Sequence, residues 1–285
     1  MEIKASQVKE LRDMTGVAMM ECKKALVESN GDIEKAIDLL RSNSALKAEK
    51  KSSRVAADGV LVLSMGNGYV SMVELNSETD FASKDSNFLA FGEKVKNYIS
   101  KNKITEPLAF LDSEIEDERK SLVQTIGENI QLRRVETIDF NNDMQIGSYL
   151  HSDSKLGAIV SINGGNENVA KDIAMHVAAF NPLCLSRDDI SIDLLEREKA
   201  IFENQAKDSG KPKEIMEKMI EGKINRFLSE VSLLSQSFVK DSEITIEEYL
   251  ASNKATIKAF VRLKVGEGIE VETKDFAEEV AEQLK

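Results

Sequence analysis

The chain has 285 residues, of which 41% are hydrophobic and 31% charged, a profile that excludes a disordered or fibrous protein and favours a soluble globular one. This length is sufficient for two or three structural units. The formal net charge of −12 disfavours direct binding of DNA or RNA, because a nucleic-acid site needs a positive field that neutralises phosphates.

Cysteine and histidine are scarce and scattered. Cys22 and Cys184 show no disulfide pattern, and two histidines, His151 and His176, are too few for a typical zinc site. We therefore expect no bound metal and no cofactor. The first residues lack the regions of a signal peptide, and no apolar run approaches the length that spans a membrane. The expectation is a cytoplasmic protein with no membrane partner.

The first 54 residues predict three short helices and a link. Ser6 is the expected N-cap of the first helix, and Gly16 is its expected end because glycine permits the positive φ of a tight exit. A second helix stops near Gly31, and Asp32 caps a third. Helices this short must pack on one another, so we expect one small bundle. The charged stretch Lys47–Ser53 is expected to link this bundle to the rest of the chain.

From residue 56 the hydrophobic pattern changes to that of strands. A hairpin with its turn at Gly66–Gly68 is followed by helices at about 88–99 and 115–127 and by a strand over 129–138. A similar order returns as a hairpin over 146–162, a helix over 170–179 and a strand over 257–265. This weak internal repeat predicts two related α+β lobes, each a small antiparallel sheet covered by helices.

An insertion at about 187–228 interrupts the second lobe. Apolar stripes at helical spacing lie on both sides of Asp208–Pro212, which predicts an antiparallel helical hairpin that protrudes as a coiled coil. A last helix at 274–284 closes the chain. The expected units are 1–54 for the bundle and its link, 55–140 for the first lobe, and 141–285 for the second lobe with the hairpin and the last helix.

No constellation of catalytic residues stands out. The sequence has no Walker-type phosphate loop, no strand-to-helix serine elbow and no dinucleotide fingerprint. His176 lies on an apolar helix stripe, where a histidine is usually a hydrogen-bonded packing residue. His151 has no nearby cysteine with which to form a nucleophile pair. We therefore expect a protein that is not an enzyme.

The segment Asn76–Phe81 directly after the strand over 69–75 is the most informative part of the chain. Thr79 or Asp80 can cap a helix that starts there, which places Phe81 in the first helical turn beside a carboxylate. Two interpretations of Phe81 are open: an apolar wedge for a partner, or a staple that packs back on the helix. Residue chemistry alone favours the staple.

Two blocks carry a specific resemblance to a known family. Leu11–Leu26 and Glu74–Lys84 are similar, in the expected order, to the two signatures of the bacterial translation elongation factor Ts family. Ala18 and Ala82 depart from that pattern, which usually has glycine and valine there. The similarity continues through Ile126–Ile130, Ile173–Ala179, Ser209–Pro212 and Val265–Ile269, and so covers essentially the whole chain.

The resemblance implies a fold, a partner and an activity. The fold is α+β, with an N-terminal bundle like a ubiquitin-associated domain, two duplicated lobes, a coiled-coil hairpin and a C-terminal helix. The partner is the GTPase elongation factor Tu, bound in its GDP and nucleotide-free states, with a two-to-two complex as one arrangement. The activity is guanine-nucleotide exchange, in which GDP release from the partner is accelerated so that GTP can bind.

The resemblance also assigns residues and reverses the preference for Phe81. The corner residues Thr79, Asp80, Phe81 and Ala82 are expected to disturb the partner's Mg²⁺ site, with Phe81 as the wedge and Asp80 positioning it. Arg12, Met19 and Met20 are expected to hold the partner's GTPase domain from the other side, and at least one of the methionines should be exposed.

Two other classes of function remain open at this point. A non-catalytic adaptor would use the bundle to recruit a partner and the helical hairpin to hold an assembly. A small-molecule enzyme would need a deep pocket with a perturbed histidine or carboxylate.

Overall fold

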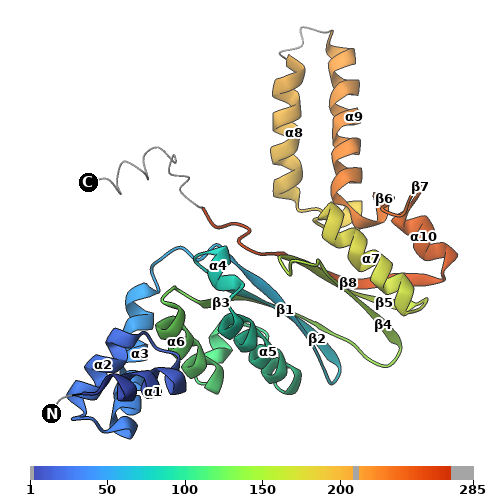
Figure 1. The fold of residues 1–285 in the computed structure, drawn as a ribbon. Coiled ribbons are helices and arrows are strands. Elements are labelled where there is room, and N and C mark those ends of the chain that lie inside the picture. Colours follow the sequence, from blue (N-terminus) through green and yellow to red (C-terminus); the bar gives the residue numbers. More distant parts are fainter. Residues whose placement is uncertain (1–2, 208–211, 271–285) are drawn as a thin grey trace.

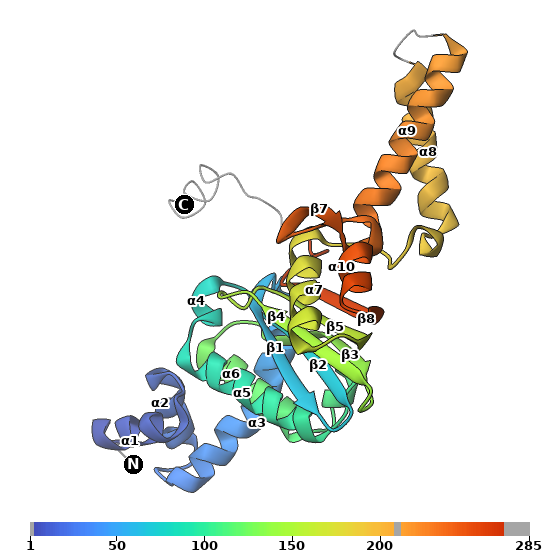
Figure 2. The ribbon, with the colours of Figure 1, turned by 90° about the vertical axis from the view of Figure 1, so that its right-hand side faces the viewer.

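Two three-stranded antiparallel sheets pack face to face, and helices cover the outer side of each sheet (Figure 1). The computed structural model describes residues 3–207 and 212–270. The mixture of helices with small antiparallel sheets confirms the predicted α+β class. In both views the N-terminal helices and the long pair α8 and α9 lie at opposite ends of the sheets (Figure 2).

Three helices at the N-terminus pack around one small core, as predicted. They are α1 (Ala5–Thr15), α2 (Met19–Glu28) and α3 (Ile33–Lys51). Their buried apolar residues are Val8, Leu11, Val17, Cys22, Ala25, Leu26, Ala36 and Leu40.

The ends of α1 and α3 agree with the prediction at Gly16 and at Asp32. Gly16 ends α1 with a φ of 69°, and the Asp32 carboxylate accepts a hydrogen bond from the Lys35 backbone N–H at 3.1 Å. The predicted cap Ser6 is wrong, because α1 begins one residue earlier at Ala5. The Gln7 side chain accepts from the backbone N–H of Lys4 at 3.1 Å and so closes the first turn around Lys4.

The predicted link Lys47–Ser53 is helical as far as Lys51 and is therefore wrong over most of its length. Ser44 and Ala48 on α3 are buried, and α3 packs along α6. Lys47 also forms an ion pair with Glu21 of α2 at 2.7 Å. Tertiary contacts on two sides thus continue the helix through a charged stretch that looks like a linker in the sequence.

The first sheet has the order β1-β2-β3 and forms lobe N with helices α4, α5 and α6. The predicted hairpin and third strand are confirmed. The bounds are β1 (Asp58–Gly66), β2 (Tyr69–Ser77), α4 (Asp80–Ser83), α5 (Ser86–Lys101), η1 (Pro107–Phe110), α6 (Glu114–Ile126) and β3 (Gln131–Asp139). One face of β2 sends Val73 and Leu75 into the core beneath α5 and α6.

The second sheet has the order β4-β5-β8 and forms lobe C with helices α7 and α10. Its middle strand is again the second strand of a hairpin, as in lobe N, which agrees with the predicted repeat. The bounds are β4 (Met144–Leu150), β5 (Leu156–Gly164), α7 (Glu167–Phe180), β6 (Ser237–Phe238), β7 (Asp241–Thr245), α10 (Ile246–Ser252) and β8 (Ala255–Lys264).

The small hairpin β6–β7 and the helix α10 are absent from the sequence prediction. Thr245 and Glu248 form a capping box at the start of α10, with the Thr245 hydroxyl accepting from the Glu248 backbone N–H at 3.2 Å. That spacing of threonine and glutamate is a signal readable in the sequence. The two-residue strand β6 has no such signal.

The inner faces of the two sheets form a core between the lobes. Side chains alternate along β2, so Met72 points away from the helices and toward lobe C, where Ile159 and Leu263 meet it. This core of buried residues contains Leu61, Val70, Met72, Ile138, Ile159 and Leu263. An apolar core therefore joins the two lobes.

The insertion forms two long helices that lie side by side (Figure 1). They are α8 (Ile192–Lys207) and α9 (Lys213–Val231), preceded by η2 (Arg187–Asp189) and followed by η3 (Leu233–Ser235). Phe202 and Phe227 meet edge to face, with ring centroids 6.4 Å apart. Residues 208–211 of the predicted break and the whole predicted helix 274–284 lie outside the described residues. Among the described helices, none is both long enough and apolar enough to cross a membrane.

Candidate partner-binding site

The corner between β2 and the single-turn helix α4 presents Phe81 to solvent. Thr79 is the N-cap of α4, and its hydroxyl accepts a hydrogen bond from the Ala82 backbone N–H at 3.3 Å. The predicted cap at this position is thus confirmed. The side chain of Phe81 is 83% exposed, so the staple interpretation is wrong. A residue in the first turn of so short a helix finds no neighbouring turn to cover it.

Asp80 and Ala82 face in different directions from Phe81. The Asp80 carboxylate forms an ion pair with Lys84 at 2.7 Å, one helical turn further on. This contact raises the pKa of Lys84 above its usual value, through its hydrogen bond to Asp80. Ala82 is buried, and so is the following Ser83. Of the four corner residues predicted from the sequence, Phe81 is therefore the one that offers a large apolar surface to another molecule.

Glu128, from the loop between α6 and β3, forms two hydrogen bonds to the corner on its solvent side. One carboxylate oxygen accepts from the Thr79 backbone N–H at 2.9 Å, and the other accepts from the Thr79 hydroxyl at 2.7 Å. A second hydrogen bond joins the same two segments in the opposite direction. Here the carboxylate belongs to the corner segment, at Glu78, and accepts from the Asn129 backbone N–H at 2.6 Å. Sequence reasoning did not assign Glu128, since nothing in the sequence pairs position 79 with a residue 49 positions away.

Asp58 at the start of β1 holds the other end of α4. Its carboxylate accepts from the Ser83 hydroxyl at 3.0 Å and from Lys155 of lobe C at 2.7 Å. Burial opposes the charge on Asp58, but the hydrogen bonds from Lys155, the Gly59 backbone N–H and Ser83 outweigh it and lower the pKa of the carboxyl group. The corner is thus tied to both lobes.

The residues predicted on the N-terminal bundle lie at its surface. Arg12 is exposed in the last turn of α1, and Met19 and Met20 are exposed by 41% and 64% in the first turn of α2. The expectation that at least one methionine is exposed is therefore confirmed. Met20 and Val27 line a shallow apolar hollow of about 300 Å³. Flexible thioether chains at such a surface can adapt to the shape of a partner.

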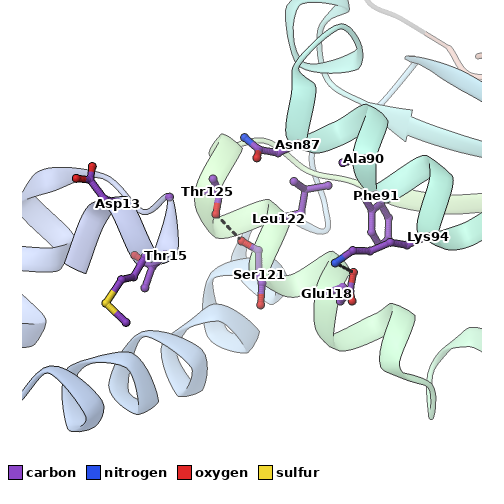
Figure 3. A pocket seen from close by; sticks show the side chains of 12 residues that line it. Asp13, Thr15, Asn87, Ala90, Phe91, Lys94, Glu118, Ser121, Leu122 and Thr125 are labelled. Carbon is purple, nitrogen blue, oxygen red and sulfur yellow. Dashed lines mark hydrogen bonds and ion pairs between the residues drawn. The ribbon is translucent and has the colours of Figure 1, made fainter. Parts of the chain in front are cut away.

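A groove separates the bundle from the corner. One hollow of about 400 Å³ is bounded by Phe81 and Glu128 on one side and by Gly16 on the other. It shares Gly16, Asn87 and Thr125 with a second hollow of about 440 Å³. Figure 3 shows this second hollow with Asp13 and Thr15 on the bundle side and residues of α5 and α6 opposite.

The groove brings together only part of the predicted site. Phe81 faces the loop between α1 and α2 across it, but Arg12, Met19 and Met20 are not among its lining residues. Met14 of α1, which was not among the predicted site residues, also lines the groove and is exposed. It lies in the last turn of α1, one residue before the helix ends at Thr15.

The side chains that sequence reasoning tested for catalysis have structural partners. His176 is fully buried, with Nε2 at 2.9 Å from the Gln236 side-chain oxygen and Nδ1 accepting from the Val239 backbone N–H at 3.2 Å. The predicted packing role of His176 is thus confirmed. His151 pairs with Asp153 at 2.9 Å. Within residues 3–207 and 212–270, no group of three histidine, cysteine or acidic side chains is placed to hold a metal ion.

An exposed aromatic corner, exposed methionines and a groove between the bundle and the corner are features of a protein-binding surface. The comparisons with known proteins give the family of the chain. The family model described as elongation factor Ts matches residues 78–267, which include the corner and most of both lobes.

Relatives with the same name match over nearly their full length. Elongation factor Ts of Hahella chejuensis is 50% identical over 285 residues, which is 99% of both chains. That of Psychrobacter arcticus is 48% identical and covers 98% of this chain and 96% of its own. That of Cellvibrio japonicus is 50% identical and covers 97% and 95%. The chain therefore belongs to the elongation factor Ts family.

Proposed function

We propose that this chain is a guanine-nucleotide exchange factor for elongation factor Tu and acts in translation elongation. Membership of the elongation factor Ts family supports the activity and the partner. The observation that carries the mechanism is Phe81, a large apolar side chain that is 83% exposed on a corner held by hydrogen bonds at both ends.

The proposed step is mechanical. Phe81 enters the partner's GTPase domain and shifts the elements around its Mg²⁺ ion. Mg²⁺ requires near-octahedral geometry with oxygen ligands at about 2.0–2.1 Å, so a displacement of a fraction of an ångström weakens both the ion and the phosphates that it bridges. Ala82 forms the buried inner side of the corner, Thr79 caps its turn, and Asp80 with Lys84 forms a charged group beside the wedge.

Arg12, Met19 and Met20 are proposed to bind the same GTPase domain from the side of the bundle. Their exposure supports this role, and the groove between bundle and corner leaves room for an element of the partner. The three-helix bundle is then the ubiquitin-associated-like module that the family resemblance implies, and the pair α8 and α9 is the coiled coil. A two-to-two assembly stays a prediction.

Exchange by this route has a thermodynamic consequence. If the chain weakens GDP binding to its partner, GDP weakens the binding of the chain by the same factor. The complex with both GDP and the exchange factor is therefore short-lived. No bond is made or broken in this scheme, so the chain accelerates dissociation without the residues of an active site.

The test is the release of fluorescently labelled GDP from purified elongation factor Tu. Increasing concentrations of the chain should raise the release rate until it saturates, with unlabelled GDP present in excess as a trap. An adaptor would bind elongation factor Tu in a pull-down experiment and leave the release rate unchanged. That result would overturn the proposed function and favour the adaptor.

A further inference from the structure

We propose that Glu128 is a positioning residue for exchange, which sets the Asp80–Phe81 corner in the conformation that enters the partner. This inference rests on the proposed function and adds to it a residue outside the corner itself. Glu128 lies in the loop after α6, and it lines the same hollow as Phe81.

Thr79 connects Glu128 to the helix α4 through two hydrogen bonds of its hydroxyl group. A hydroxyl group has one hydrogen to donate, and here that hydrogen goes to the Glu128 carboxylate at 2.7 Å. The hydroxyl oxygen then turns its lone pairs toward the Ala82 backbone N–H, which donates at 3.3 Å. The second oxygen of Glu128 also fixes the Thr79 backbone through its N–H at 2.9 Å. Glu128 thus sets both the backbone and the side chain of the N-cap.

The conformation of the corner depends on these hydrogen bonds because the helix α4 is too short to be stable without them. It contains four residues, and isolated helices of that length are unstable in water. Phe81 is too exposed for packing to define its direction, so the direction follows from the backbone of the turn. Charge-assisted hydrogen bonds to a carboxylate are among the stronger contacts available to fix such a turn.

The loop that carries Glu128 is itself firmly placed. Gly127 ends α6 with a φ of 85°, a conformation that glycine adopts without strain. Asn129 is buried, and its side chain donates to the backbone oxygen of Arg54 at 2.7 Å. Lys51, at the end of α3, donates to the backbone oxygen of Gly127. Glu128 therefore connects the corner to a point where the bundle and lobe N meet.

The experiment compares Glu128→Ala, Thr79→Val, Thr79→Ser and the double variant Thr79→Val with Glu128→Ala in the GDP release assay. Glu128→Ala and Thr79→Val should each lower the maximal release rate by about tenfold, because the competent conformation of the corner is then populated only part of the time. The double variant should be no slower than the slower single variant, since both changes break one unit. Thr79→Ser keeps the hydroxyl and should retain the rate.

Two further measurements separate positioning from other roles. Amide hydrogen exchange of Ala82 in the free protein should be faster in both variants, because Glu128→Ala frees the Thr79 hydroxyl that caps Ala82 and Thr79→Val removes that hydroxyl. The matched control is Asp139→Ala, which removes an exposed carboxylate at the opposite end of the strand β3 that follows Glu128, and it should change neither the rate nor the exchange. The unfolding temperature should stay near that of the original chain in every variant.

Each remaining outcome overturns a stated claim. Release as fast with Glu128→Ala as with the original chain overturns the role of Glu128 alone. Slow release with Glu128→Ala but normal release with Thr79→Val and unchanged Ala82 exchange means that Glu128 touches the partner directly, which overturns positioning. If the original chain itself fails to accelerate GDP release, the proposed function is wrong, and the role of Glu128 in exchange is wrong with it.

Discussion

Phe81 keeps an aromatic ring in water at a position where hydrogen bonds, and not packing, set its direction. Thr79 caps the turn, Glu128 holds Thr79, and Asp58 holds Ser83 at the other end of the turn. Burial of a phenylalanine side chain contributes about 2–3 kcal/mol. The ring of Phe81 does not gain this free energy in the free protein, and it would gain it on binding to a molecule that buries the ring.

The first prediction concerns this ring. Phe81→Ala should slow GDP release from elongation factor Tu by about tenfold or more, because truncation of a central apolar contact removes most of its effect. Folding should be unaffected, since the ring is 83% exposed. The matched control is Leu108→Ala, an apolar residue of lobe N that is 68% exposed and does not line the groove. Release that is equally fast in both variants would remove the wedge from the mechanism.

His176 is one residue through which pH acts on the stability of the folded chain. Its Nδ1 accepts from the Val239 backbone N–H, so the hydrogen of the neutral ring lies on Nε2 and is donated to Gln236. If Nδ1 took up a second proton, two donors, the Nδ1–H and the Val239 N–H, would point at each other, which disfavours the protonated ring. Burial lowers the pKa of His176, and it outweighs the opposing effect of the hydrogen bond to Gln236.

The second prediction follows from the sign of this shift. In the unfolded chain the histidine takes up its proton near pH 6.5, while in the folded protein it does so only at lower pH. Its contribution to stability is therefore present above about pH 6.5 and is lost progressively as pH falls below that value. Urea unfolding at pH 7.5 and 5.5 measures the difference. His176→Gln should reduce the pH dependence, and His151→Gln, at an exposed position, should retain it.

At the scale of elements, helix α7 lies directly on strand β4. Gly147 makes this possible, because a Cβ atom there would lie 2.0 Å from the carbonyl carbon of Ala170 in α7. Backbone cannot yield as a flexible side chain does, so the two elements would have to move apart. The close approach buries Ala170 and Ala174 of α7 against the sheet.

The third prediction is that Gly147→Ala lowers the free energy of unfolding of the chain by about 3 kcal/mol, through the loss of this packing. Gly222→Ala is the control with the opposite sign. Gly222 lies inside α9 with no atom within 4 Å of a new Cβ, so alanine there should stabilise the helix by about 1 kcal/mol. Circular dichroism during urea unfolding measures both. Equal stability of the two variants would contradict the close approach of α7 to β4.

Some helix caps were predictable from the sequence, whereas the length of α3 was not. Capping by Asp32 and Thr79 was predictable, because a side chain bonds to the backbone of its own turn. The length of α3 was not, since its last turns are helical through contacts with α6, more than sixty residues later. The contact of Glu128 with Thr79 was also not predictable, because the residues next to each position give no sign that the two side chains meet.

At the scale of the whole molecule, Glu74 joins the lobes. It is fully buried and accepts from Arg133 at 3.1 Å, from Arg134 at 2.5 Å and from the backbone N–H of Gly266 at 2.8 Å. The arginines also donate to backbone oxygens of the chain around Gly266, at Lys264 and Glu267. Burial opposes the charge on Glu74, but the hydrogen bonds outweigh it and lower the pKa of the carboxyl group.

The fourth prediction is that Glu74→Gln destabilises the chain by about 3 kcal/mol, because the half-buried Arg133 and Arg134 lose the charged acceptor that pairs with both of them. For the native carboxylate, the lowered pKa means that its contribution is present above the unfolded value of about 4.3 and is lost as pH falls through the folded value. Urea unfolding at neutral pH measures the substitution. Glu136→Gln, an exposed position on the same strand as Arg133, is the control and should change stability by less than about 0.5 kcal/mol.

The sequence by itself determined the hairpins β1–β2 and β4–β5, the helix ends at Gly16 and Asp32, the α+β class and the repeat of the two lobes, because these depend on local hydrogen bonds and on the alternation of apolar side chains. It also carried the resemblance on which the proposed activity rests. Only the tertiary structure decided that Phe81 points into solvent, that Met14 lines a groove with the corner, and that Glu128 and Glu74 hold distant segments. These contacts join residues far apart in the chain, and the spacing of residues along a sequence contains no information on which distant side chains meet.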